Sequence, residues 1–230
     1  MRTSLLAPAF LLTLALSLAA CSGDSDAPAT ANDPAAPGST TPSNEPTTDE
    51  PTTDEPAPPT EVPGAPGVVR SRNLATVMDA GDGAELCLGA IAESYPPQCG
   101  GPAISNWSWK DYAGTFEKQG DIRWATYAVT GTWDGTEFTV NEAISGALYD
   151  PMPIEPTELP TPATQYTEAE LDEIATTVGS DLPSAGGAYI DQDGHVLVGV
   201  TYDDGTLQDY VDATYGAGVV VVSGQLVDAG

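Results

Sequence analysis

The chain has 230 residues, with 34 acidic and 6 basic side chains, a single histidine and three cysteines, and its formal net charge is -28. Six cations among so many carboxylates cannot neutralise a phosphate backbone or an anionic lipid surface, so the composition excludes nucleic acid as a partner. We find no Gly-rich phosphate loop and no nucleophile motif in the sequence, and we expect no cofactor, no metal and no enzymatic activity.

Residues 1–20 have the pattern of an export signal. Arg2 precedes an apolar run over residues 5–18, which at about 14 residues is shorter than the roughly 20 needed to cross a bilayer. The run ends in Leu18-Ala19-Ala20-Cys21, which resembles the lipobox of bacterial lipoproteins. The resemblance implies that Cys21 is acylated, for example with palmitate, and anchors the protein to the extracytoplasmic face of the cell membrane. The alternative is an ordinary cleaved signal with an incidental cysteine.

Residues 21–67 are predicted to form an acidic tether rich in proline and threonine. Residues 22–66 contain eleven prolines and nine acidic side chains but no basic or aromatic one. Such a segment cannot bury enough apolar surface to offset the entropy lost on ordering. We therefore expect a disordered stalk that holds the folded body away from the membrane.

Residues 68–149 are predicted to form a small β domain. Residues 122–133 make a long aromatic and β-branched run, and Asp134-Gly135 separates it from a second run at 136–140. Asp-Gly between two such runs is a strong hairpin signal because both turn positions favour a positive φ. We expect an antiparallel barrel or sandwich of about five strands. An oligonucleotide-binding-type barrel has a similar number of strands, although the charge argues against nucleic acid.

Cys87 and Cys99 are the cysteines of this β domain. The export signal places them in an oxidising compartment, where a disulfide is the favoured state. The alternatives are a metal pair or a nucleophile, but this domain contains no histidine to complete a zinc site or to activate a thiolate.

Trp107, Trp109 and Tyr112 are candidate binding residues. Two tryptophans on one face of an extended segment can stack on a sugar ring or on an apolar side chain of a partner. The alternative is that they form the core of a small β domain.

The spacing of aromatic, glycine and cysteine residues in this domain resembles a group of uncharacterised exported lipoproteins of actinobacterial type. The residues that carry the resemblance are 85–89, 94–102, 107–109 and 124–135. They cover most of residues 85–140. The resemblance implies no activity.

Residues 150–163 contain five prolines, which neither a helix nor a central strand accepts, so we place a linker there.

Residues 164–230 are predicted to form an acidic α+β layer of order α-β-β-α-β, a three-stranded sheet with both helices on one face. The first helix starts with the capping box Thr167 to Glu170 and stops at Gly179, and a hairpin turns at residues 192–194. The second helix is capped by Thr206, and a last strand covers residues 219–222. The fold class is therefore α+β, and the sequence does not say whether its two folded pieces pack as one unit.

His195 borders the hairpin turn and is predicted to be an exposed turn residue. No nucleophile motif accompanies it, so the sequence does not indicate a catalytic triad. The stretch Asp191-Gln192-Asp193-Gly194 lacks the later ligands of a calcium loop, and hairpin chemistry explains it.

Residues 151–230 carry fourteen acidic side chains and no lysine or arginine. We expect a non-enzymatic lipoprotein that uses its small β domain or this acidic α+β layer to bind an envelope protein, and a cationic patch of that partner would dock on the acidic layer. The alternatives are a carbohydrate-binding or wall-modifying protein that uses Trp107 and Trp109, and a structural spacer without a ligand. A saline habitat would produce the same acidity without any partner.

Overall fold

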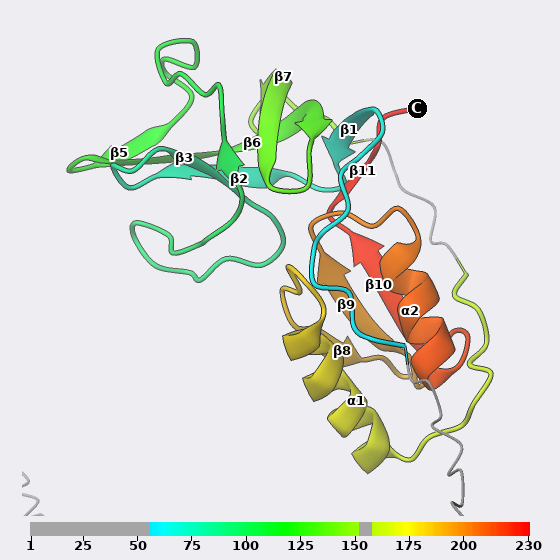
Figure 1. The fold of residues 1–230 in the computed structure, drawn as a ribbon. Helices are drawn as coiled ribbons and strands as arrows, with labels where there is room; N and C mark the ends of the chain where they lie inside the picture. The colour runs from blue at the N-terminus through cyan, green and yellow to red at the C-terminus, as the bar shows by residue number, and fades with distance from the viewer. Residues whose placement is uncertain (1–55, 152–157) are drawn as a thin grey trace, which may run out of the picture. The chain divides into compact units, whose positions relative to one another are not determined.

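A computed structural model describes residues 56–151 and 158–230 (Figure 1). The predicted signal, Cys21, most of the predicted tether and residues 152–157 of the predicted linker lie outside the described residues. Within the described ranges, neither helix has the length and apolar composition of a membrane span.

The N-terminal piece is built around a closed five-stranded barrel. Its strands are β2 (Ala75–Asp79), β3 (Ala84–Cys87), β4 (Ala103–Ile104), β6 (Ile122–Trp133) and β7 (Glu137–Ser145). They pair in the order β6-β2-β3-β4-β7, and β7 pairs again with β6 to close the ring. The predicted small β domain is confirmed as a barrel. The expected antiparallel pairing is wrong at one place, because β4 and β7 run parallel.

Five-stranded barrels of this kind include those that bind oligonucleotides and oligosaccharides. The architecture by itself assigns no ligand, because unrelated functions share such barrels.

Strand β6 forms one wall of the barrel. Tyr127, Val129 and Trp133 on its inner face are buried, as the two-residue period of a strand requires. The predicted turn at Asp134-Gly135 joins β6 to β7: Gly135 has φ 105°, and the Asp134 carboxylate accepts hydrogen bonds from the backbone of Thr136 and Glu137. These bonds lower the pKa of Asp134, and the bond from Glu137 has the largest effect.

Three short strands extend the sheet around the barrel: β1 (Val68–Ser71), β5 (Glu117–Gln119) and β11 (Leu226–Asp228). Strand β1 lies between β6 and β11 and is antiparallel to both. Strand β11 comes from the C-terminal piece and was not predicted. Tyr202 of that piece also belongs to the barrel core, so the C-terminal piece contributes a strand and a core side chain to the barrel side, although other buried residues of it form a core cluster of their own.

The folded body begins before Val68, so the predicted tether boundary at residue 67 is too late. Val62 and Ala65 pack against the barrel core. Trp133 Nε1 donates to the Pro63 carbonyl oxygen at 2.9 Å, and the Ala65 N–H donates to the Trp133 carbonyl oxygen at 2.9 Å. A buried indole that needs an acceptor thus orders a proline-rich segment that has little apolar surface of its own.

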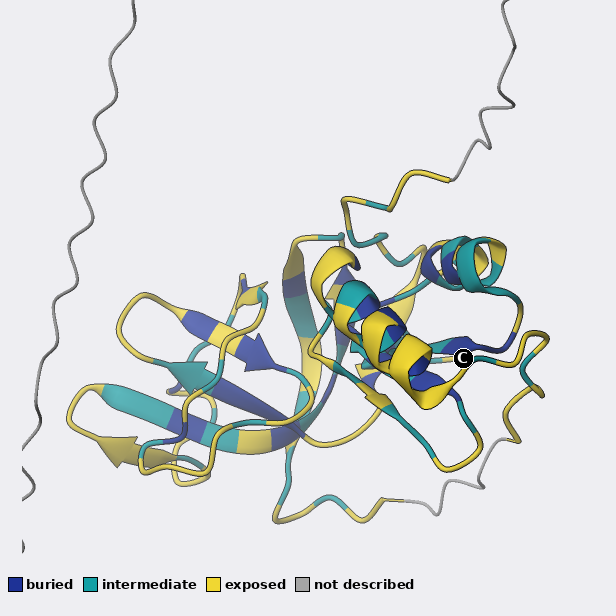
Figure 2. Ribbon diagram, turned by 90° about the horizontal axis from the view of Figure 1, so that it is seen from below, coloured by how far each residue is buried: buried dark blue, intermediate teal, exposed yellow. Residues whose placement is uncertain are grey.

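The C-terminal piece has the predicted α-β-β-α-β order, followed by β11. Its elements are α1 (Glu168–Asp181), β8 (Ala188–Ile190), β9 (Val196–Val200), α2 (Thr206–Tyr215) and β10 (Val220–Gly224). The sheet order is β10-β9-β8, with β9 and β10 parallel. Figure 2 shows each helix with a buried stripe and an exposed side. The buried residues of α1 and Val211 of α2 form one core cluster with β9 and β10.

The helix ends differ from the prediction at two positions. The capping box of α1 is confirmed, but α1 continues through Gly179 to Asp181. Helix α2 starts at Thr206, with Gly205 as its N-cap. Its first N–H groups donate instead to two upstream carboxylates: Leu207 N–H to Asp203 and Thr206 N–H to Asp204.

Candidate functional site

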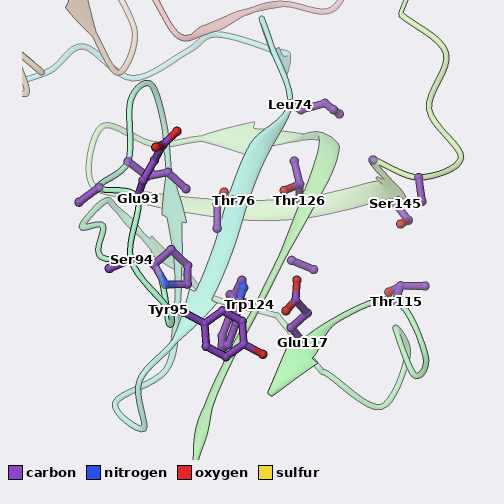
Figure 3. Close-up of a pocket in the computed structure, with 16 residues that line it drawn as sticks. Leu74, Thr76, Glu93, Ser94, Tyr95, Thr115, Glu117, Trp124, Thr126 and Ser145 are labelled. Atoms are coloured by element: carbon purple, nitrogen blue, oxygen red, sulfur yellow. The ribbon is translucent and has the colours of Figure 1, made fainter. Parts of the chain in front are cut away.

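A groove of about 900 Å³ lies on the outer face of the barrel (Figure 3). Its floor is formed by β2 and β6, where Thr76 pairs with Thr126 and therefore points to the same side of the sheet. Figure 3 shows Leu74 and Glu93 at one end, and Tyr95, Trp124 and Glu117 at the other. The end of β7 at Ser145–Ala147 completes the lining.

The loop between β3 and β4 forms one wall of the groove. The predicted disulfide between Cys87 and Cys99 is confirmed, with the two Cα atoms 5.8 Å apart, and it ties the loop to the end of β3. Inside the loop, Ala92 and Gln98 form an antiparallel bridge, and Ser94 Oγ donates to the Pro96 carbonyl oxygen at 2.7 Å. The wall is therefore fixed by covalent and hydrogen bonds, although it contains no regular strand.

One end of the groove is aromatic. Trp124 lies on the opposite face of β6 from Tyr127, yet only 7% of it is exposed, because the loop covers it. The ring of Tyr95 meets the ring of Trp124 edge to face, with centroids 5.2 Å apart and planes at 86°. Tyr95 itself is 66% exposed, so this end offers an accessible aromatic surface on a rigid support.

The barrel interior beneath the floor is a packed aromatic layer. Tyr127 is fully buried, and its hydroxyl oxygen lies 2.9 Å from Thr115 Oγ1. Burial raises the pKa of Tyr127 above its ordinary value, outweighing the hydrogen bond to Thr115, which lowers it. The phenol therefore stays protonated at neutral pH and acts as a packing and hydrogen-bonding group.

The candidate binding residues Trp107, Trp109 and Tyr112 lie against this layer, away from the groove. The rings of Trp107 and Tyr112 stack at 4.1 Å, and both contact Tyr127. Trp109 is 8% exposed, and its Nε1 donates to an Asp79 oxygen at 2.9 Å. Their contacts are those of core residues.

His195 is buried, so its prediction as an exposed turn residue is wrong. Only 5% of it is exposed. Its Nδ1 lies 2.8 Å from an Asp191 carboxylate oxygen, and its Nε2 lies 2.9 Å from the Pro160 carbonyl oxygen. Since both partners are acceptors, satisfying both requires two N–H donors, which only the imidazolium has.

The environment of His195 favours that charged form. Burial lowers the pKa of His195, but the hydrogen bonds to Pro160 and Asp191 and the charges of Asp191 and Asp193 raise it by more, so the net shift is upward. The hydrogen bond from His195 Nε2 to the Pro160 carbonyl oxygen holds the end of the predicted linker against the α+β layer, which is a structural role.

The groove residues Tyr95, Glu117 and Trp124 were not among the predicted site residues. The sequence did contain two signals: Tyr95 lies in a loop closed by the two cysteines, and Trp124 is out of phase with the buried positions of its strand. Neither signal identifies a groove without knowing where the loop folds back.

Comparison of the chain with protein-family models, curated proteins and solved structures returns no match. The resemblances to bacterial lipoproteins and to the actinobacterial-type group therefore remain predictions. Within residues 56–151 and 158–230, no group of three or more His, Cys, Asp or Glu side chains is arranged to hold a metal ion.

Proposed function

We propose that the chain is an exported lipoprotein, anchored through Cys21 to the extracytoplasmic face of the cell membrane, whose barrel groove binds another envelope protein. The lipobox-like sequence supports the anchor. The disulfide between Cys87 and Cys99 supports an oxidising compartment, because such bonds persist outside the cytoplasm. The tether between the anchor and the body would give the groove reach from the membrane.

The observation that carries the binding role is the exposed aromatic end of a groove whose wall is held by a disulfide. Tyr95 is exposed although it is supported by Trp124 and by a closed loop, and rigid exposed aromatic side chains are typical anchors in protein interfaces. The groove also contains two carboxylates, Glu93 and Glu117. Both are exposed, whereas a carboxylic acid that donates a proton in catalysis is usually kept protonated by burial. Binding therefore fits this lining better than hydrolysis.

The anchor is tested by labelling cells with radioactive fatty acid. The wild-type chain should incorporate the label and a Cys21→Ala variant should not. Equal labelling of both chains would refute the anchor.

The binding role is tested by placing a photo-crosslinking phenylalanine analogue at Tyr95 and, as a matched control, at Tyr189. The two tyrosines are 66% and 65% exposed, but Tyr189 does not line the groove. We expect a discrete adduct with an envelope protein from position 95 only. Equal adducts from both positions, or none from position 95, would refute the groove and leave a spacer without a ligand.

A further inference from the structure

The groove has a charge arrangement that selects its ligand. On the paired strands β5 and β6, Glu117 is opposite Trp124, and Lys118 is opposite Arg123. Opposite residues of an antiparallel pair point to the same face, and successive residues alternate. Glu117 therefore accompanies Trp124 into the groove, whereas the two cations point to the other face.

Neither groove carboxylate has an ion-pair partner within the described residues. Arg123 lies 3.8 Å from Asp79, and the other ion pair found there joins His195 to Asp191. The groove lining includes no lysine, arginine or histidine. Figure 3 places Glu93 and Glu117 at opposite ends, so the negative charge spans the length of the groove.

The rest of the groove lining is largely apolar. It includes Leu74, Ile91, Pro97, Trp124 and Ala147, and Leu74 is exposed together with Tyr95. A ligand therefore has to offer apolar surface and positive charge within a short distance. Lysine and arginine side chains do both, because an apolar stem carries a cationic tip, and a guanidinium also stacks on aromatic rings.

We propose that the groove binds an extended segment of an envelope protein in which a lysine or arginine adjoins an aliphatic or aromatic residue. This inference rests on the proposed function and specifies the partner of the same groove. A neutral glycan has no cation to meet the two carboxylates, and an anionic wall polymer is repelled by them. The favoured ligand is thus a cationic, partly apolar peptide.

The test measures fluorescence anisotropy of a labelled peptide, acetyl-Gly-Lys-Leu-Lys-Gly-amide, with the full mature chain kept unlipidated by Cys21→Ser. A second peptide has glutamine in place of both lysines. We expect the lysine peptide to bind more tightly, and more weakly as salt increases. The double variant Glu93→Gln/Glu117→Gln should weaken its binding by about 2- to 5-fold for each carboxylate removed.

The matched control is Glu142→Gln/Glu173→Gln, which removes the same charge from two exposed carboxylates outside the groove lining. It should change the affinity by less than about 2-fold, since neither carboxylate lines the groove and salt screens exposed charges over a Debye length of about 8 Å. An equal loss in both double variants would show that only the overall charge attracts the peptide, and would overturn the inference.

A further pair of variants separates the two proposals. Tyr95→Ala should weaken binding of the lysine peptide and Tyr189→Ala should not. If both peptides bind equally and both depend on Tyr95, the groove binds ligands but the requirement for a cation is wrong. If neither peptide binds and Tyr95 gives no crosslink in the envelope, the proposed function itself is wrong.

Discussion

Removal of the disulfide should destabilise the folded body and loosen the groove wall. Cys87 and Cys99 are 12 residues apart, and in the chain-entropy model a crosslink closing a loop of that size stabilises the native state by about 3 kcal/mol at 25 °C. For a body of this size, the same difference lowers Tm by about 6 to 12 °C. The effect arises in the unfolded chain, which becomes less restricted.

The measurement is urea unfolding of the oxidised and the reduced wild-type chain, followed by tryptophan fluorescence. This comparison keeps both sulfur atoms in place, so it isolates the covalent bond from the packing of Cys87, which is buried. A Cys87→Ala/Cys99→Ala variant should lose stability to at least the same extent.

Two results would contradict this expectation. Oxidised and reduced chains that unfold within about 1 kcal/mol of each other would show that the loop is not constrained by the bond. If stability falls but Trp124, which the loop covers, stays equally protected from chemical modification, the bond stabilises the fold without forming the groove wall.

Three further changes have defined outcomes. His195→Gln should lower the free energy of unfolding, measured by urea titration, more at pH 6 than at pH 8.5. Because folding raises the pKa of His195, the stabilisation by its charged form is present below the pKa of the unfolded chain, near 6.5, and is lost as the pH rises through the pKa of the folded chain. A Gly131→Ala change should destabilise by at least about 2 kcal/mol, because its Cβ would overlap the Thr139 carbonyl oxygen; an unchanged urea midpoint would contradict this. Thr167→Ala should cost about 1 kcal/mol by removing the cap of α1, measured by thermal unfolding, and Thr167→Ser should restore most of it.

The parts of the fold that could be predicted from sequence are those specified by neighbouring residues. The turn at Asp134-Gly135 and the capping box at Thr167 depend on a few adjacent side chains, and both are confirmed. The disulfide was predictable because the export signal restricts the chemistry of Cys87 and Cys99.

Apart from the helix ends at Gly179 and Thr206, the wrong predictions concern contacts between distant residues. The position of His195 beside a hairpin turn predicts an exposed side chain, but the ring is buried and meets the Pro160 carbonyl, 35 residues earlier. Strand β11 was missed because its partner is β1 at the other end of the folded chain. The order of residues 62–65 depends on Trp133, about 70 residues later. The groove is also of this kind, since its wall and floor come from segments that meet only in the fold.

The binding role of the groove is tested most directly by the yield of crosslinked envelope protein from position 95, measured with and without Glu93→Gln/Glu117→Gln. We predict one main adduct that contains a cationic segment at the crosslinked position, and a yield that falls in the double variant but not in Glu142→Gln/Glu173→Gln. An adduct whose yield is the same in all three chains, or the absence of an adduct, would contradict the assignment of this groove as the binding site for a cationic partner.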